Sequence, residues 1–296
     1  MLAEELLQGA YDLHIHTAPD VAERKLDDFE MAERAKKAGI KGFGIKSHYF
    51  CTAERARMVQ KIHPEVNAIG AITLNNSVGG INPIAVEMAG RDGAKIVWMP
   101  TVDAENEQAF FRSGKHIKLP FWAKLQSELL EQGKVSESIS VLKENGDLKK
   151  EVLDVLDIIS NKNMVLATAH LGKKETFEVV KAAGNLNVKK IIITHPNFPS
   201  INFSKEEQKE LAELGAYMEH CFTTPYSNKI SWADLYEQIR FVGPEHCILS
   251  TDLGQPNSIY PDEGLKEMYT NLLENGFTCE EVKSMAQINP AKLIED

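Results

Sequence analysis

The feature that most constrains this chain is a repeated alternation of short apolar runs with amphipathic segments. Eight apolar runs of strand length follow one another, at residues 11–16, 41–48, 67–74, 94–100, 164–170, 189–195, 216–222 and 246–252. The segments between them place apolar residues at helical spacing. Near-continuous apolar strands that alternate with helices are typical of a parallel sheet covered by helices on both faces.

The number of strands indicates how that sheet is arranged. Eight strand–helix units in 296 residues fit an α/β fold of the (β/α)8 TIM barrel type, with residues 1–296 forming a single domain. No GxGxxG motif follows any of the strands, which argues against a doubly wound dinucleotide-binding sheet. Glycines after the helical segments predict helix ends at Gly39, Gly93, Gly184 and Gly215.

One interval is longer than a barrel requires. Residues 103–147, between the fourth and fifth strands, contain aromatic residues and the turn sequence Glu144-Asn145-Gly146-Asp147, which predicts a small hairpin. An insertion after a barrel strand lies on the C-terminal face, where barrel enzymes hold their active sites. We therefore expect this insertion to form either a lid over the site or a contact between subunits.

Charge and composition narrow the class of partner. The net charge of −10 argues against nucleic acid or an anionic membrane as a partner and leaves a small-molecule substrate, with a homo-oligomer still open. No apolar run is long enough to span a membrane, and the acidic first segment does not resemble a signal peptide, so we expect a cytoplasmic protein. Cys51, Cys221, Cys247 and Cys279 form no CxxC pair and predict free thiols.

Metal-binding residue types recur where the predicted strands end. His14 and His16 close the first strand, and His170, His195 and Asp252 close the fifth, sixth and eighth. All strand ends of a barrel meet at one mouth, and residues two apart on a strand share a face. Imidazole and carboxylate groups suit zinc, with manganese or iron as alternatives. The combined pattern predicts a divalent metal site that includes these five residues.

Other polar residues fall near the same mouth. Lys46 and His48 share a face at the end of the second strand, and we expect them to bind substrate. Glu219 and His220 are two further candidate substrate-binding residues, at the end of the seventh strand. They lie on opposite faces, so only one can face the mouth, and periodicity does not decide which. The remaining histidines are interpreted as structural or surface residues: His63, His116 and His246.

The ordered pattern resembles the amidohydrolase superfamily of metal-dependent hydrolases. The similarity rests on YDLHIHTAPD, TAHL, ITHPNF and LSTDLGQ, and extends to the tail EEVKSMAQINPAKLI. The resemblance implies that His14, His16 and Asp252 hold the more buried metal and that Asp252 takes a proton from its water. It implies that His170 and His195 complete a second metal site or orient water and substrate.

The sequence departs from that superfamily at the fourth strand. Members with two metals usually carry a bridging lysine or glutamate there or on the fifth strand, whereas this strand ends in Trp98-Met99-Pro100-Thr101. One tightly held ion is therefore favoured over two, with Lys46 as an unusual alternative bridge. A single-metal site is also similar to the deaminase-like and decarboxylase-like branches.

A second resemblance leads to a different reaction. DLHIHT followed by AKKAGIKGFGIKSH is similar to the opening of the polymerase-and-histidinol-phosphatase family of metal phosphoesterases. That similarity fades after residue 50, and Ser47-His48 stands where the family has Asp-His. We expect a hydrolase that activates a metal-bound water to cleave an amide, lactone or ester, with Asp252 and His195 as catalytic residues.

Overall fold

The computed structural model describes residues 2–114, 121–134 and 137–295. Every predicted apolar run contains a strand. The strands are β1 (Tyr11–Ile15), β2 (Gly42–Ile45), β3 (Asn67–Ile69), β4 (Ala71–Thr73), β5 (Ile96–Trp98), β6 (Val165–Ala167), β7 (Ile191–Thr194), β8 (Tyr217–Cys221) and β9 (Cys247–Ser250). The third run is divided into β3 and β4 by Gly70, a division that the apolar pattern does not reveal.

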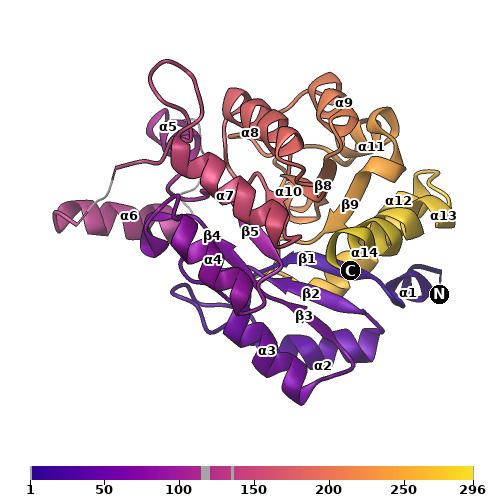
Figure 1. Ribbon diagram of the computed structural model, residues 1–296. Helices are drawn as coiled ribbons and strands as arrows, with labels where there is room; N and C mark the ends of the chain where they lie inside the picture. Colours follow the sequence, from indigo (N-terminus) through magenta and orange to yellow (C-terminus); the bar gives the residue numbers. More distant parts are fainter. Residues whose placement is uncertain (1, 115–120, 135–136, 296) are drawn as a thin grey trace.

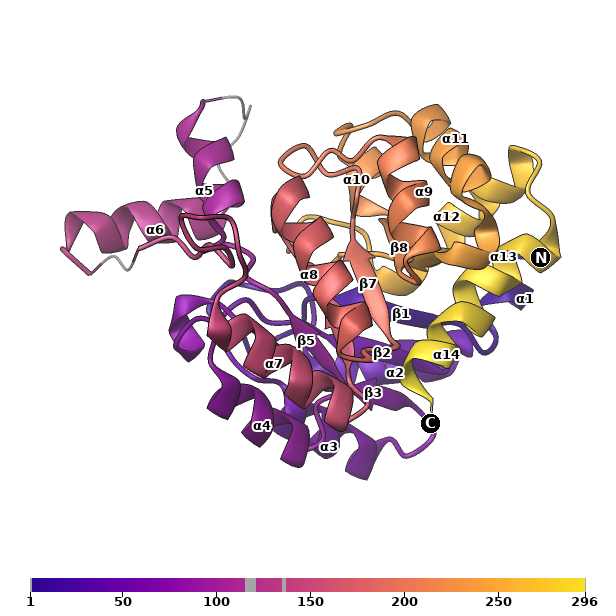
Figure 2. The same ribbon diagram turned by 45° about the horizontal axis from the view of Figure 1, so that its top comes forward.

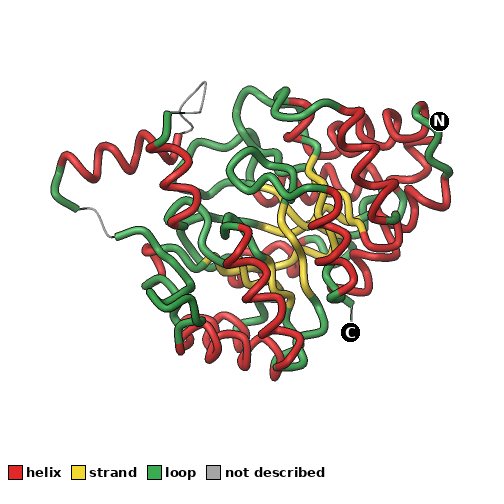
Figure 3. Tube along the Cα trace, turned by 90° about the horizontal axis from the view of Figure 1, so that it is seen from above, coloured by secondary structure: helices red, strands yellow, loops and turns green. Residues whose placement is uncertain are grey.

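Helices follow the strands and surround them (Figure 3). They are α1 (Leu2–Leu7), α2 (Asp28–Ala38), α3 (Ala53–Ile62), α4 (Pro83–Arg91), α5 (Glu105–Arg112), α6 (Phe121–Glu131), α7 (Lys150–Asn161), α8 (Lys173–Asn185), α9 (Lys205–Glu213), α10 (Thr223–Tyr226), α11 (Trp232–Val242), α12 (Pro261–Glu274), α13 (Cys279–Lys283) and α14 (Asn289–Ile294). A π-helical segment, Ser284–Ile288, joins α13 to α14.

All strand pairs are parallel, as predicted for an α/β fold. One sheet has the order β1-β2-β3, and the other has the order β4-β5-β6-β7-β8-β9. Two further contacts connect β1 to the end of β9: a parallel bridge between Ile15 and Leu253, and a hydrogen bond from Asp252 N to His14 O at 2.8 Å. The carboxyl ends of β1 and β9 are therefore held side by side.

Local sequence signals explain where several helices begin and end. Asp27 caps α2 by accepting hydrogen bonds from Phe29 N and Glu30 N, and Gly39 ends it with a left-handed backbone at φ 77°. Gly184 does not end α8 as predicted, because the helix continues through it to Asn185. The left-handed residue after α8 is Asn187, at φ 59°, and asparagine tolerates that conformation.

The core consists of apolar side chains from the strands and the inner helix faces, with Trp98, Tyr11 and Phe43 among the largest buried residues. No helix in the described ranges combines the length and apolar character needed to cross a membrane. All four cysteines are free thiols, as predicted.

The segment between β5 and β6 carries α5 and α6, and Figures 1 and 2 show α6 extending away from the other helices. Leu142 and Leu148 form an antiparallel bridge around the predicted hairpin turn. The start of α5 is tied to the neighbouring strand ends, because the Asn106 amide donates hydrogen bonds to His170 O and Ser200 O. His116 and Pro120 lie outside the described residues.

Candidate metal centre

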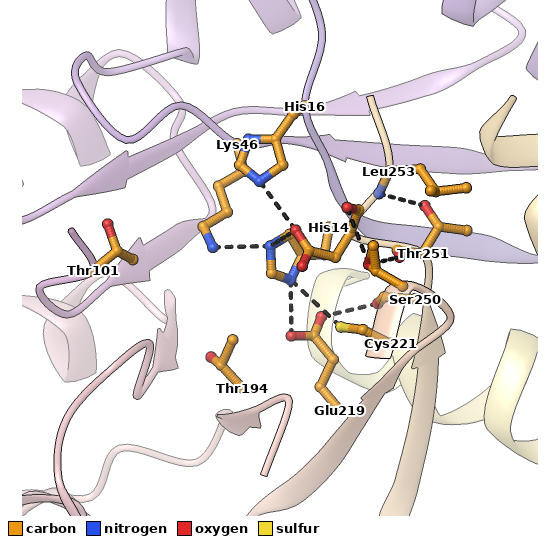
Figure 4. A network of polar contacts seen from close by, with 12 residues as sticks. His14, His16, Lys46, Thr101, Thr194, Glu219, Cys221, Ser250, Thr251 and Leu253 are labelled. Atoms are coloured by element: carbon orange, nitrogen blue, oxygen red, sulfur yellow. Dashed lines mark hydrogen bonds and ion pairs between the residues drawn. The ribbon is translucent and has the colours of Figure 1, made fainter. Parts of the chain in front are cut away.

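His14, His16 and Asp252 meet where β1 and β9 end. Figure 4 shows the two histidines of this group with several of their neighbours. Asp252 Oδ1 lies 3.1 Å from His14 Nε2 and 3.2 Å from His16 Nε2. The two histidines converge because residues two apart in an extended chain share a face. Asp252 reaches them from a left-handed backbone, at φ 54°.

The electrostatics of this group favour an ionised carboxylate beside a neutral imidazole. Burial alone would raise the pKa of Asp252, but His14 and His16 outweigh it and hold that pKa well below its usual range. Burial, followed by the positive charge of Arg24, lowers the pKa of His16 to about 3. The site therefore offers a carboxylate oxygen and an imidazole lone pair, which are the forms that bind cations.

The other nitrogen of His14 has a carboxylate partner. His14 Nδ1 lies 3.1 Å from Glu219 Oε2, and the Ser250 hydroxyl donates to Glu219 Oε1 at 2.9 Å. Cys221 Sγ lies 3.8 Å from the same nitrogen. A carboxylate behind a histidine fixes the ring's orientation and tautomer and leaves the opposite nitrogen as the ligand.

This arrangement shows which of Glu219 and His220 faces the mouth, a choice that periodicity leaves open. Glu219 is the residue of β8 that faces His14. His220 lies on the opposite face, near the Asn197 amide at 3.5 Å, and is not brought into the group. Burial lowers the pKa of His220 to about 3.

Lys46 and His48 lie beside the group formed by His14, His16 and Asp252. The Lys46 ammonium donates to His14 Nε2 at 2.8 Å (Figure 4). It also lies 4.3 Å from the centre of the Trp98 ring. Burial lowers the pKa of Lys46, whose side chain is almost entirely enclosed. The His48 ring stacks on His16 with centroids 4.9 Å apart, and its Nδ1 lies 2.9 Å from the Thr101 hydroxyl.

His170 and His195 form a second pair, with ring centroids 5.0 Å apart. His195 also lies 5.9 Å from His14, measured between ring centroids. Burial and the charge of His170 lower the pKa of His195 well below its ordinary value. Neither Nδ1 atom has a hydrogen bond within the described part of the chain, although Glu107 Oε2 lies 3.3 Å from His170 Nδ1.

The donor set fits a divalent cation. Within the described ranges, two groups of three side chains bring ligand atoms within 4.8 Å of one another: His14, His16 and Asp252, and His14, Glu219 and Cys221. His16 Nδ1 is buried without a hydrogen-bond partner in the described residues. Two imidazoles and a carboxylate suit zinc and related metals. Glu219 is better explained as the residue that orients His14, because its second oxygen is already bonded to Ser250.

Three residues near the site were not predicted from the sequence. Glu107 comes from α5, Cys221 ends β8, and Arg24 follows β1 in a loop. The sequence does contain one indication of Arg24: Asp20 and Arg24 follow the HxH motif, carry opposite charges and lie four residues apart, a spacing that allows an ion pair. Glu107 offers none, because it lies in a long segment whose position relative to the strands is not specified by periodicity.

Comparison with known proteins gives a family but no activity. A family model described as a family of unknown function, DUF6282, matches residues 9–219, more than two thirds of the chain. The chain belongs to this family. No curated protein matches it in sequence.

Solved structures similar to this DUF6282 member share its fold along nearly the whole chain. An amidohydrolase from Pseudomonas aeruginosa has 13% identity and a TM-score of 0.64, over 100% of this chain and 97% of that one. An organophosphorus hydrolase from Deinococcus radiodurans has 14% identity and a TM-score of 0.61, over 99% and 93%. A lactonase from Listeria monocytogenes has 12% identity and a TM-score of 0.58, over 98% and 95%. The chain therefore shares the fold of these three enzymes, and this is the kind of fold that the sequence motifs predicted.

Proposed function

We propose that this protein is a metal-dependent hydrolase of small molecules in which His14, His16 and Asp252 hold the metal ion. The observation that carries the proposal is the convergence of their three ligand atoms at the carboxyl ends of β1 and β9. Enzymes with parallel α/β barrels place their chemistry at those ends. The similar solved structures described as an amidohydrolase, a lactonase and an organophosphorus hydrolase support the same reaction class.

The eight strand segments are proposed to close into one (β/α)8 barrel. The bridge from Ile15 to Leu253 supports closure on one side. On the other side, β3 and β4 belong to different sheets but are separated only by Gly70, which accepts a hydrogen bond from Lys95 N at 2.8 Å. Closure would bring His170 and His195 to the same mouth as the HxH motif.

A bound zinc, manganese or iron ion would supply a hydroxide nucleophile at neutral pH and would polarise the bond that is attacked. The chain's own residues then have distinct tasks. Oδ1 of Asp252 contacts the two histidines, whereas Oδ2 has no hydrogen bond to any described residue. Oδ2 can therefore accept the proton from water. Glu219 keeps the His14 ring in place through Nδ1.

The remaining histidines and Lys46 are assigned to the substrate. His195 presents a neutral ring because its pKa is lowered, and it can donate a hydrogen bond to charge that develops on the attacked oxygen. Lys46 contacts His14, and the His48 ring stacks on His16. Within the described residues, His170 and His195 do not join the ligand group of Asp252, so we propose one tightly held ion.

Metal analysis tests the ligand assignment. Protein purified without chelator is expected to contain about one equivalent of metal by mass spectrometry, and His16→Asn is expected to lose it. His246→Asn is the matched control, because that histidine lies in the short turn before β9, at the opposite end from Asp252. Wild-type protein that never takes up metal, or His16→Asn protein that retains it, would contradict the proposal.

Turnover tests the role of Asp252. A panel of lactones, N-acyl amino acids, carboxylic esters and phosphoesters identifies the bond that is cleaved. With the best substrate, Asp252→Asn is expected to reduce kcat by ~10²–10⁴-fold, the usual contribution of a general base. Wild-type kcat in this variant would remove Asp252 from that role, whatever its effect on metal content.

A further inference from the structure

The loop after β1 holds an arginine in a fixed position at the metal centre. Arg24 donates two hydrogen bonds to Asp20 Oδ2, from Nε at 2.8 Å and from Nη2 at 2.6 Å. The Asp20 side chain is fully buried, and the Arg24 side chain is only 8% exposed. Asp20 Oδ1 is itself held by Val21 N and by the Ser47 hydroxyl. The guanidinium is therefore positioned before any ligand arrives.

The contacts of this loop place Arg24 against the proposed substrate site. The hydrogen bond from the Ser47 hydroxyl to Asp20 connects the loop to the end of β2, where Lys46 and His48 lie. On the other side, the backbone N of Lys25 donates to Gly254 O at 2.9 Å, two residues beyond Asp252. Arg24 thus follows His16 in the chain and lies between the ends of β2 and β9.

One edge of the guanidinium is available for a ligand. Arg24 Nη1 has no hydrogen bond or ion pair among the described residues, whereas Nε and Nη2 are both used by Asp20. Arginine has donors and no acceptor, and its planar group matches carboxylate and phosphate oxygens. Lys46, at the end of β2, adds a second cation beside His14, and its hydrogen-bond partner is this histidine rather than a carboxylate.

We propose that Arg24 binds an anionic group of the substrate, a carboxylate or a phosphate, and that Asp20 positions the guanidinium for it. This inference rests on the proposed function, since it assumes that the substrate lies at the His14–Asp252 group. It restricts the substrate to small molecules that carry a negative charge near the bond to be cleaved. A net charge of −10 on the whole chain does not oppose this, because the metal and the two cations reverse the local sign.

Titration calorimetry with inorganic phosphate and with acetate tests the proposal and distinguishes the two anions. The titrations use protein as purified and protein treated with EDTA, so that direct binding of the anion to metal is separated from binding to Arg24. We expect saturable binding of at least one anion. Its affinity should fall by about 10- to 100-fold in the double variant Asp20→Asn/Arg24→Gln, as expected for one charge-assisted contact.

Three further variants make the result specific. Asp20→Asn alone keeps the guanidinium but loses the carboxylate that positions it, so its affinity should fall, though by less than that of the double variant. Arg24→Lys keeps the buried positive charge but loses the planar guanidinium, so it should weaken anion binding. This variant replaces the double variant in the test if the double variant fails to fold. Arg34→Gln is the matched control, because Arg34 also makes a two-pronged pair, with Asp262, but on the outer surface between α2 and α12. It should bind as the wild type does.

The outcomes separate this inference from the proposed function. Equal anion affinity in wild-type, double-variant and Arg24→Lys protein, or no saturable binding of either anion to the wild type, would overturn the role of Arg24 even if one metal equivalent is present. Anion binding that depends on Arg24 in a protein that never binds metal would overturn the hydrolase proposal and leave the anion site standing.

Discussion

The buried ring of His220 leads to a quantitative prediction about stability in acid. Burial lowers the pKa of this histidine from 6.5 to about 3. Its contact is an amide nitrogen of Asn197 at 3.5 Å, and its Nε2 is buried without a hydrogen-bond partner in the described residues. The folded protein therefore holds the ring neutral, whereas the unfolded chain protonates it near pH 6.5.

The magnitude follows from the two pKa values. Because the folded pKa lies below the unfolded one, the contribution to stability is fully present above pH 6.5 and is lost as the pH falls towards 3. A difference between 6.5 and about 3 corresponds to ~5 kcal/mol over that whole interval. At pH 4.5, two pH units below the unfolded value, the loss is ~3 kcal/mol.

Urea unfolding of EDTA-treated wild type and His220→Phe, each at pH 7.5 and pH 4.5, measures this loss. Other groups titrate equally in both proteins, so the difference between the two pH-dependent changes isolates His220. We expect the free energy of unfolding of the wild type to fall by ~3 kcal/mol more than that of the variant. If the free energy of unfolding falls equally in the wild type and the variant, to within roughly 0.5 kcal/mol, the assumption that the folded ring stays neutral is refuted. That margin is about the precision with which such differences add.

Three other predictions concern the site directly. Glu107→Gln removes the carboxylate that lies 3.3 Å from His170 Nδ1 and should lower kcat by about 10- to 100-fold, whereas Glu105→Gln, on the exposed side of α5, should leave kcat unchanged. Gly254→Ala should reduce the free energy of unfolding in urea by at least ~2 kcal/mol, because its Cβ would lie 1.7 Å from His16 O at a φ of 134°. Removal of metal with EDTA should lower Tm by roughly 5 °C or more, and added zinc should restore it.

The strands were predictable because each is a short, nearly continuous apolar run, a pattern that only a sheet covered on both faces requires. The residues that close those strands were predictable for the same reason. Once His14, His16 and Asp252 are placed at strand ends, parallel topology alone brings them to one edge. Gly184 shows the limit of local signals, since a glycine that predicts a helix end lies within α8.

The parts of the site that depend on loops and on strand phase were not predictable. In β8, alternation supports either Glu219 or His220 facing inwards, and the choice is made by the contact with His14 Nδ1. Glu107 reaches His170 only because α5 packs against the strand ends. No periodic pattern in the long segment from 103 to 147 specifies that packing, so it emerges only from the three-dimensional fold.

The backbone at the strand ends explains why even correctly placed residues need the fold to become a site. Ala169, His195 and Asp252 adopt φ values of 53°, 26° and 54°, a region that side chains other than glycine enter at a cost of about 1–3 kcal/mol. Hydrogen bonds between neighbouring strands hold two of these turns: Ala169 N donates to Thr194 Oγ1 at 3.0 Å, and Asp252 N donates to His14 O at 2.8 Å. If the backbone stayed extended at these residues, the chain would continue in the direction of the strand. The left-handed backbone instead turns the chain where the strand ends. The packing of the whole sheet thus supports a local conformation that none of these residues would adopt alone, and the geometry of the candidate metal ligands depends on it.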